Sequence, residues 1–408
     1  MELAIIGGGP AGLSAAIRAK ELGIKDVWVI ERAKKLGGIL NQCIHHGFGV
    51  HVFKEELTGP EYAQRLIDRA SELEVNFVLG AMVTDITPDR RFTYASERGL
   101  VTVCPQAVIL AMGCRERSRG AVGIPGDRVA GVFSAGAAQA LVNMKGFALG
   151  KQVVILGSGD IGLIMARRMT LEGASVLGVY EIMPHSSGLK RNIAQCLNDY
   201  NIPLHLSQTV TRIRGKRRLE GVYVASVDKN LNPDYETETF VPCDTLLLSV
   251  GLIPENELSL KMGVELSPIT GGAIVNNRLE TNIPGVFAAG NVLHVHDIVD
   301  YVTEEAYIGA ENAVRFMRGD VSGGNKIKVR AGEGVRYTVP MEVVWQGSEV
   351  TELISFRVNK VFSKAEIAIT AGGKTIHSAK KRILLPSEME RVEIRLSEPV
   401  HEVTVEVR

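Results

Sequence analysis

The first forty residues hold the feature that most restricts what this chain can fold into. An apolar run at 3–6 predicts a buried strand, the pattern Gly7-x-Gly9-x-x-Gly12 follows at once, and residues 13–21 predict a helix. A second apolar run ends on Glu31, nineteen positions after Gly12. A strand that passes through three spaced glycines into a helix, with an acid after the next strand, is typical of a dinucleotide crevice. The unit therefore predicts a parallel α/β sheet that binds a dinucleotide.

Each residue type in this unit has a physical task. Gly7 permits the tight turn, Gly9 lets the main chain approach a pyrophosphate, and Gly12 lets helix and strand pack closely. The first helical turn directs N–H groups and a partial positive charge at the phosphates. Glu31 can accept hydrogen bonds from a ribose diol. The alternative, an ordinary strand-to-helix turn, does not explain the order of all these parts.

The same unit occurs a second time, with the same order of parts and the same spacing. Its glycines are Gly157, Gly159 and Gly162, and Glu181 again follows the last glycine by nineteen positions. The predicted elements are a strand at 151–156, a helix at 163–171 and a strand at 176–180. Two intact units predict two bound dinucleotides; a degenerate copy that binds nothing is the alternative. The candidate contacts in the second unit are Gly157, Gly159, Asp160, Ile161, Gly162, Glu181 and Gly251.

Bulk composition narrows the function classes. The 408 residues exceed what one hydrophobic core usually serves, so two or three domains are expected. The 46 basic residues balance 46 acidic ones, which argues against nucleic acid as a partner. The five cysteines are scattered without a C-x-x-C pair, which favours a reducing compartment. No apolar run is long enough to span a bilayer, and the opening strand leaves no room for a signal peptide. We expect a cytoplasmic protein.

Three further segments make the pattern specific. They are an apolar run at 106–111 that stops at Met112-Gly113, the run TLLLSVG at 245–251, and GVFAAGN at 285–291. Together with the repeated unit they resemble the pyridine nucleotide-disulfide reductases, whose FAD domain is split by an inserted NAD(P) domain. The resemblance implies FAD and NAD as cofactors. It also implies an FAD domain at 1–145 and 256–320 and an NAD domain at 146–255.

The resemblance also assigns candidate FAD contacts. In the family, an acid at the position of Asn291 binds the ribityl chain, and the amide found here can still donate and accept hydrogen bonds. The helix predicted at 297–317 would point its N-terminus at the flavin. Arg115 and Arg117 could face the phosphates or the flavin edge, or form a solvated charge cluster. The candidate FAD contacts are Gly7, Gly9, Pro10, Ala11, Gly12, Glu31, Arg32, Gly38, Val83, Met112, Gly113, Arg117, Gly290 and Asn291.

The last eighty residues depart from the family. Residues 319–328 are predicted to be a glycine-rich polar linker, and five short runs after them alternate apolar and polar residues. This alternation, with a period of two residues, predicts a small antiparallel β-sandwich at 329–408 in place of the family's mixed α/β dimerisation domain. The predicted fold class is therefore two Rossmann-like domains plus a β-sandwich. An oligomer is still expected.

Cys43 is the one cysteine in the region where disulfide reductases carry two. A dithiol relay needs both thiols, so that mechanism is excluded. Cys43 either packs beside the flavin or acts as a single redox-active thiol, and His45 is a candidate proton donor. The spacing of Cys43 with His45, His46 and His51 matches no common metal site, so no metal is predicted.

The segment at 37–49, GGILNQCIHHGFG, and the segment GCRER at 113–117 resemble a subgroup without the dithiol. Its members are flavoprotein subunits of amine, opine, proline and glycerol-3-phosphate dehydrogenases or oxidases. This resemblance, closest to the glycerol-3-phosphate type, implies a second flavoprotein subunit and a small cysteine-rich subunit as partners. Glu181 would repel the 2′-phosphate of NADP, which favours NAD. A standalone NADH oxidase using Cys43, and a non-catalytic nucleotide-binding assembly subunit, remain as alternative hypotheses.

Overall fold

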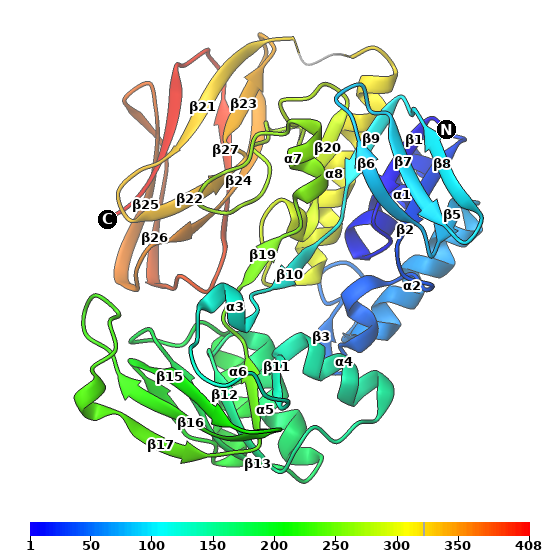
Figure 1. The fold of residues 1–408 in the computed structure, drawn as a ribbon. Helices are drawn as coiled ribbons and strands as arrows, with labels where there is room; N and C mark the ends of the chain where they lie inside the picture. The colour runs from blue at the N-terminus through cyan, green and yellow to red at the C-terminus, as the bar shows by residue number, and fades with distance from the viewer. Residues whose placement is uncertain (321–322) are drawn as a thin grey trace. The chain divides into compact units, whose positions relative to one another are not determined.

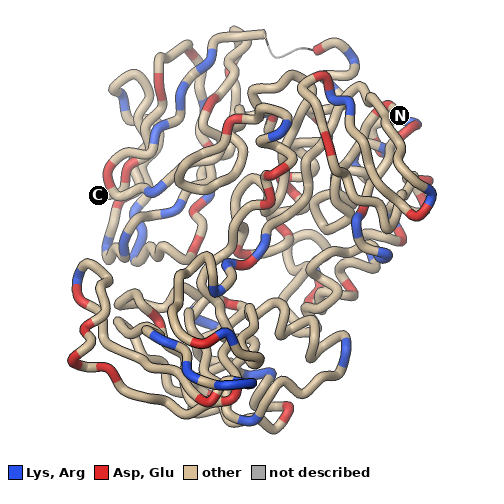
Figure 2. The backbone as a smooth tube through the Cα atoms, viewed as in Figure 1, with Lys and Arg blue, Asp and Glu red and all other residues tan. Residues whose placement is uncertain are grey.

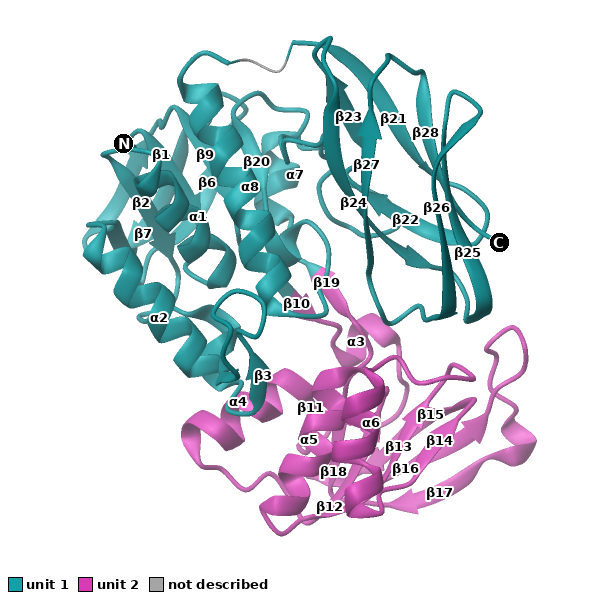
Figure 3. Cartoon of the chain, turned by 180° about the vertical axis from the view of Figure 1, so that it is seen from behind, with its two compact units in different colours: residues 1–114, 254–408 teal, residues 115–253 magenta. Residues whose placement is uncertain are grey.

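In the computed structural model, the apolar run at the start of the chain forms β1 (Leu3–Ile6), in the middle of a parallel sheet (Figure 1). The structure describes residues 1–320 and 323–408. Two compact units make up the described chain (Figure 3). Unit 1 contains Met1–Cys114 and Pro254–Arg408, and unit 2 contains Arg115–Ile253. The chain passes between them through β10 (Cys114–Glu116) and β19 (Leu252–Pro254), which pair with each other.

The parallel sheet of unit 1 has the strand order β20-β9-β1-β2-β5, and a three-stranded sheet, β6-β7-β8, accompanies it. One face of the parallel sheet packs against α1, α2 and α8, and the other packs against β6, β7 and the segments at 262–293. The elements, besides β1, are α1 (Pro10–Glu21), β2 (Val27–Glu31), η1 (Gly38–Gln42), β3 (His46–Phe48), β4 (Leu57–Thr58), α2 (Gly59–Glu72), β5 (Asn76–Leu79), β6 (Met82–Ile86), β7 (Phe92–Ser96), β8 (Gly99–Val103), β9 (Ala107–Leu110), α7 (Glu257–Met262), β20 (Val286–Ala288), η4 (Gly290–Val292) and α8 (Val299–Met317).

Unit 2 repeats this architecture. Its parallel sheet has the order β11-β18-β12-β13-β14, in which each strand corresponds to the strand at the same place in unit 1, and β15-β16-β17 is antiparallel. The elements are α3 (Arg119–Val122), β11 (Val132–Ser134), α4 (Ala135–Lys145), β12 (Gln152–Leu156), α5 (Asp160–Leu171), β13 (Ser175–Glu181), α6 (Lys190–Cys196), η2 (Asn198–Tyr200), β14 (Leu204–Leu206), β15 (Gln208–Gly215), β16 (Leu219–Ser226), η3 (Tyr235–Thr237), β17 (Thr239–Pro242) and β18 (Thr245–Leu248).

The C-terminal part of unit 1 is a β-sandwich, as the alternating pattern predicts. Its sheets have the orders β23-β21-β28-β25-β26 and β22-β24-β27, and all pairs are antiparallel except β21 with β28. The strands are β21 (Asn325–Ala331), β22 (Val335–Val339), β23 (Glu342–Trp345), β24 (Val350–Val358), β25 (Phe362–Ala371), β26 (Lys374–Leu384), β27 (Glu390–Leu396) and β28 (Glu402–Val407). Their inner faces form a separate apolar core.

The structure differs from the sequence predictions at three places. Residues 115–145 belong to unit 2, because β11 extends the unit 2 sheet by pairing with β18. Of the predicted linker at 319–328, residues 321–322 lie outside the described residues, and 325–328 already belong to β21. The sandwich has eight strands where five runs were predicted, partly because β26 is rich in lysine and shows little apolar alternation.

The sandwich packs on the nucleotide-binding part of unit 1 through buried polar contacts. The guanidinium of Arg357 contacts the carboxylate of Asp297 and donates to the carbonyl of Val295 (3.1 Å). Burial opposes the charge of Arg357, but Asp297 outweighs burial and raises the pKa of Arg357. The amide N–H of Met389 also donates to Asp297 (2.6 Å). These contacts join β24 and the segment before β27 to the loop before α8.

Charges of both signs are interspersed along the chain (Figure 2), in keeping with a net charge of zero. None of the helices in the described residues combines the length and apolar character that a membrane crossing needs.

Candidate dinucleotide sites

Three glycines shape the turn between β1 and α1. Gly7 has φ +112°, and a Cβ there would lie 2.3 Å from the carbonyl oxygen of Ala111. A Cβ on Gly12 would lie 1.9 Å from the oxygen of Gly7, so the helix rests directly on the turn. At Gly9 the nearest atom to an added Cβ, the Cα of Gly38, is 3.9 Å away. The main chain is therefore open at Gly9, where a pyrophosphate would approach it.

The N-terminus of α1 completes this cradle. Gly9 is its N-cap and Pro10 its first helical residue, which has no N–H to leave unsatisfied. Within the described residues no side chain caps this end, and the first turn holds no acid. The N–H groups of Ala11 and Gly12 and the helix dipole are thus available to an anion.

Glu31 stands at the end of β2 and is 8% exposed. The N–H of Gly8 donates to its Oε2 (2.6 Å) and the N–H of Ala33 donates to its Oε1 (2.7 Å). The two main-chain donors hold the carboxylate at the edge of the cradle. Its remaining lone pairs can accept from ribose hydroxyls.

The other predicted FAD contacts on this side are placed differently. Gly38 faces Gly9, since a Cβ on Gly38 would lie 3.0 Å from the Cα of Gly9. Arg32 is exposed, next to Glu31. The side chain of Val83 is buried in the core, so only its main-chain atoms could meet a cofactor.

The segment at 290–291 lies against the first turn of α1. Gly290 has φ +77°, and a Cβ there would lie 2.8 Å from the Cβ of Ala11. The side chain of Asn291 is engaged: its Oδ1 accepts from the N–H of His296 (3.0 Å), and its Nδ2 donates to the Sγ of Cys114 (3.6 Å). The structure thus brings Gly290 and Asn291 to the cradle.

Met112, Gly113 and Arg117 follow the return strand β9. Met112 is half-buried, and Gly113 has φ +71° with open space where a Cβ would be. Arg117 belongs to unit 2, is exposed, and donates its N–H to the oxygen of Gly251 (3.1 Å). Arg115 is also exposed and in unit 2. These arginines and the glycines of the first cradle thus belong to different units, and a contact of Arg117 with FAD stays a prediction.

The cradle of unit 2 repeats that of unit 1 in detail. Gly157 has φ +91°, and its added Cβ would lie 2.1 Å from the oxygen of Ser249. Glu181, 4% exposed, accepts from the N–H groups of Ser158 (2.9 Å) and Met183 (3.0 Å), as Glu31 does from Gly8 and Ala33. A glutamate at the equivalent position therefore holds the turn in each unit.

Unit 2 also differs from unit 1 at this cradle. A Cβ on Gly159 would lie 3.1 Å from the Oγ of Ser249, and one on Gly162 2.6 Å from the Cβ of Ser249. Asp160, in the first turn of α5, accepts from the N–H of Leu189 (2.8 Å) and from Asn192 (2.6 Å). Ile161 is half-buried, and Gly251 has φ +102° beside Arg117. The glycine turn of unit 2 is thus more closely packed than that of unit 1, and an acidic residue lies at the N-terminus of its helix.

Cys43 packs against the start of α2. A Cβ on Gly59 would lie 2.8 Å from the Cβ of Cys43, and the thiol donates to the carbonyl of Ile39 (3.4 Å). Burial raises the pKa of Cys43 to about 12. A thiol with so high a pKa is not a nucleophile near neutral pH. Among the described residues no two cysteines form a disulfide.

The neighbouring histidines have ring contacts of their own. His45 is half-buried, its Nδ1 lies 3.1 Å from the oxygen of His46, and its ring contacts Phe48 (centroids 5.0 Å apart). His51 contacts Tyr301 instead (5.6 Å). The loop that carries them is tied to α8, because Asp300, 1% exposed, accepts from the N–H groups of Gly49, His51 and Val52 (3.1, 3.1 and 2.8 Å).

A cluster that the sequence predictions missed lies beyond Asn291. His294, His296 and Glu305 place their ring nitrogens and a carboxylate oxygen together. Burial lowers the pKa of His294. Burial opposes ionisation of Glu305, but the contacts with His296 and His294 together outweigh burial and lower the pKa of Glu305 well below its usual range. The His-x-His spacing at 294–296 was the available signal; Glu305 comes to it only through the fold of α8.

Two Rossmann-like units with matching cradles define a flavoprotein of the two-dinucleotide class. The chain belongs to the pyridine nucleotide-disulphide oxidoreductase family, whose model matches residues 1–315. The family consists of oxidoreductases that use FAD and a nicotinamide dinucleotide, the two cofactors that the two cradles would hold. The family match ends before the β-sandwich.

Curated relatives and solved structures agree with this assignment. The chain is 28% identical over 316 residues to hydrogen cyanide synthase subunit HcnB of Pseudomonas protegens, covering 71% of this chain and 65% of the relative. It is 27% identical over 300 residues to an alkyl hydroperoxide reductase subunit of Pseudomonas aeruginosa, covering 72% and 54%. The chain thus spans between half and two thirds of the length of these relatives. The thioredoxin reductase structure from Lactococcus lactis has a TM-score of 0.65 at 21% identity, covering 78% of this chain and 99% of that one, and supports the fold alone.

Proposed function

We propose that this protein transfers hydride between NAD(H) and FAD and passes the electrons on to a partner protein, as the flavoprotein subunit of a multi-component dehydrogenase or oxidase. The observation that carries the proposal is a pair of matching dinucleotide cradles without a reactive thiol pair. Electrons that reach the flavin must then leave through another acceptor.

The cysteines support this interpretation. A disulfide relay needs two thiols that can approach each other, and a peroxide-reactive centre needs a thiolate. Cys43 has a pKa raised to about 12 by burial, and burial also raises the pKa of Cys243 to about 12. Packing is therefore the role that fits Cys43 best.

The chain's own residues bind and orient the cofactors. In unit 1 the open main chain at Gly9 and the N-terminus of α1 would hold the FAD pyrophosphate, and Glu31 its ribose. In unit 2 Gly159 and Glu181 would do the same for the nicotinamide dinucleotide. When bound, the flavin and the nicotinamide supply the hydride chemistry, while the protein supplies position and electrostatics.

NAD is the preferred nicotinamide cofactor in this proposal. The Oε2 of Glu181 accepts from the hydroxyls of Ser158 (2.6 Å) and Ser187 (3.2 Å), so its negative charge is held in place at the ribose position. A fixed carboxylate repels a 2′-phosphate, and no arginine occurs at 182–190 to bind one. The kcat/KM with NADH should exceed that with NADPH by at least about tenfold; equal values would contradict the preference.

The partners are proposed from chemistry and resemblance. A relative at 28% identity carries the name of a synthase subunit, which favours work beside other chains. The partners we propose are a second flavoprotein dehydrogenase subunit and a small cysteine-rich subunit, in a cytoplasmic oligomer. The glycerol-3-phosphate association rests on the resemblance of the motifs alone, and glycerol 3-phosphate is the first substrate to test.

The test is the fate of the electrons in the purified chain. Anaerobic NADH should bleach the flavin absorbance completely within a few turnovers, while steady-state oxidation with oxygen stays slow. An artificial acceptor, ferricyanide, should then raise turnover by at least about tenfold, because reoxidation rather than reduction limits the rate. Native purification should yield the partner chains. Full-rate oxidation of glycerol 3-phosphate by the chain alone would refute the subunit proposal.

The two alternatives give different results in the same assays. A standalone NADH oxidase would turn over rapidly with oxygen and would lose activity when Cys43→Ser is made. A non-catalytic assembly subunit would be colourless as isolated. The buried thiol disfavours the first alternative, and the open cradle at Gly9 disfavours the second.

A further inference from the structure

Three side chains near the start of α8 converge on one point. The Nε2 of His294 lies 2.7 Å from the Oε2 of Glu305, and the Nε2 of His296 lies 3.2 Å from the same oxygen. The two imidazole rings are 4.2 Å apart, and the three candidate ligand atoms lie within 4.8 Å of one another. Two imidazoles thus direct the same nitrogen at one carboxylate oxygen.

A second layer of hydrogen bonds holds Glu305 and His296. The N–H of Gly290 donates to the other oxygen of Glu305, Oε1 (2.6 Å). The Oδ1 of Asn291 accepts from the N–H of His296 (3.0 Å) and also lies 3.3 Å from the Nδ1 of the same residue. Metal-binding histidines and carboxylates are commonly held by such partners on their far side.

The hydrogen bonds of His296 determine which of its ring atoms faces Glu305. Because a main-chain N–H donates to the side chain of Asn291, the acceptor must be the oxygen, which fixes the orientation of the amide. The Nδ1 of His296 must then be the donor toward that oxygen. A neutral imidazole with its proton on Nδ1 has a lone pair on Nε2, and this lone pair faces the lone pairs of Glu305. A proton on Nε2 or a metal ion between the two atoms satisfies both groups, and the binding test described below distinguishes the two.

His294 adds to the argument. It is 1% exposed, and its Nδ1 has no hydrogen-bond partner among the described residues. The hydrogen bond that orients the ring is made by Nε2, the atom that faces Glu305.

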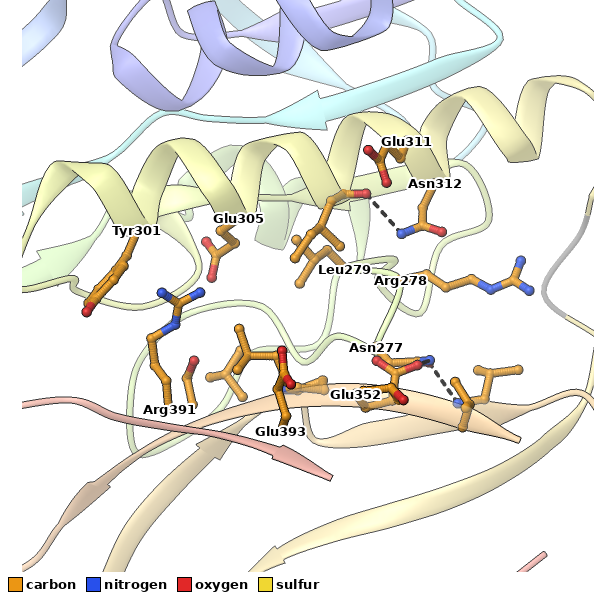
Figure 4. Close-up of a pocket in the computed structure, with 18 of the residues that line it drawn as sticks. Asn277, Arg278, Leu279, Tyr301, Glu305, Glu311, Asn312, Glu352, Arg391 and Glu393 are labelled. Atoms are coloured by element: carbon orange, nitrogen blue, oxygen red, sulfur yellow. Dashed lines mark hydrogen bonds between the residues drawn. The ribbon is translucent and has the colours of Figure 1, made fainter. Parts of the chain in front are cut away.

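The cluster also has access to a ligand. His296 and Glu305 line a cavity of about 380 Å³ between α8 and the β-sandwich, both in unit 1. Figure 4 shows the side chain of Glu305 pointing from α8 into this cavity, which Tyr301 and Arg391 also line. A site with three protein ligands and a free side is the arrangement in which a metal keeps an exchangeable position.

We propose that the Nε2 atoms of His294 and His296 and the Oε2 of Glu305 bind a divalent first-row transition metal such as Zn²⁺, with the remaining coordination positions open to the cavity. Two imidazoles and one carboxylate suit zinc, iron and their neighbours better than the oxygen-seeking Ca²⁺ and Mg²⁺. Ligand atoms at about 2.1 Å from a tetrahedral ion lie roughly 3.3 Å apart, so the observed separations need only small side-chain movements.

Zn²⁺ binding to the intact flavoprotein tests the proposal. The FAD-loaded chain is treated with a chelator, desalted, titrated with Zn²⁺ in a calorimeter and measured for metal content after removal of the excess. We expect one tightly bound Zn²⁺ per chain. Substitution with Co²⁺ should give d–d absorption to the red of the flavin bands, which a surface-bound ion would not show.

Substitutions then locate the ion. His296→Gln and Glu305→Gln should each weaken Zn²⁺ binding by more than about 100-fold, since loss of a ligand exceeds the usual effect of losing its hydrogen-bond partner. The matched controls are His401→Gln, an exposed histidine of the sandwich, and Glu311→Gln, a carboxylate elsewhere on α8; both should bind as the wild type does. Melting temperature and FAD content show whether each variant folds.

Two outcomes overturn the proposal. The first is a wild-type chain that retains no stoichiometric Zn²⁺, which would leave a proton as the cation between His296 and Glu305. This result is measured on the wild type and does not depend on the folding of any variant. The second is a Zn²⁺ affinity that the two ligand variants share with the controls. Neither outcome affects the hydride-transfer proposal, whose test measures the flavin.

Discussion

Replacing Glu352 by glutamine should remove a loss of stability that unit 1 suffers as the pH rises through neutrality. Glu352 lies on β24 and faces the cavity between α8 and the sandwich (Figure 4). Burial raises the pKa of Glu352 from its ordinary 4.5 to about 7, although the Nδ2 of Asn277 donates to its Oε1 (2.5 Å) and Arg278 lies nearby. The charged form is therefore disfavoured in the folded state.

The direction of the effect follows from this raised pKa. Below the unfolded-state pKa of Glu352 the carboxyl is protonated in both states and has no effect. As the pH rises from about 4.5 to about 7, the unfolded state ionises first and is stabilised relative to the folded state. The shift of about 2.5 pKa units corresponds to about 3 kcal/mol of lost stability above pH 7, an upper value for a group that retains some solvent contact.

The assay is denaturant unfolding of the wild type and Glu352→Gln at about pH 5 and about pH 8.5. Both tryptophans, Trp28 and Trp345, lie in unit 1, so their fluorescence reports on this unit. Glutamine keeps an oxygen that can accept from Asn277. The variant should be more stable than the wild type by about 1–3 kcal/mol at the higher pH and nearly equal to it at the lower pH.

Glu349→Gln is the matched control, because Glu349 lines the same cavity but is exposed. Its effect on stability should be the same at the two pH values. If the difference between Glu352→Gln and the wild type were also the same at both, the argument from burial would be refuted.

Three further predictions concern the nucleotide-binding part of unit 1. Cys43 should react with iodoacetamide far more slowly than the exposed Cys104 near neutral pH, because burial raises the pKa of Cys43 to about 12. The Cys43→Ser variant should keep NADH turnover within about twofold of the wild type. Equal labelling of the two cysteines, or lost turnover in the variant, would contradict this. Gly12→Ala should be purified with little FAD, as measured by the ratio of flavin to protein absorbance, because the added Cβ would lie 1.9 Å from the oxygen of Gly7; a fully loaded variant would show that the turn is not needed. Asp300→Asn should destabilise the loop at 46–53 by about 1–3 kcal/mol, because an amide offers one acceptor to three N–H groups, and unchanged hydrogen exchange there would refute it.

The sequence by itself determined the two dinucleotide units. The turns at Gly7 and Gly157, the helices after them and the positions of Glu31 and Glu181 all follow from spacing within about thirty residues. Such short-range patterns are informative because a tight turn, a helix start and a buried strand each demand particular residues locally. The β-sandwich was predicted for the same reason, since alternation is a local property of a strand.

The tertiary structure alone decided which segments pair over long distances. β11 joins the unit 2 sheet through β18, more than a hundred residues later, and no local pattern records that partner. β26, rich in lysine, is a strand because β25 offers it a partner. Glu305, on α8, contacts His294 and His296 only because the fold packs α8 against the loop that carries the two histidines. Local residue preferences determine which segments become helices and strands, whereas burial of distant elements against one another determines which of them are neighbours. The candidate metal site depends on the second of these, because its ligands come from different elements.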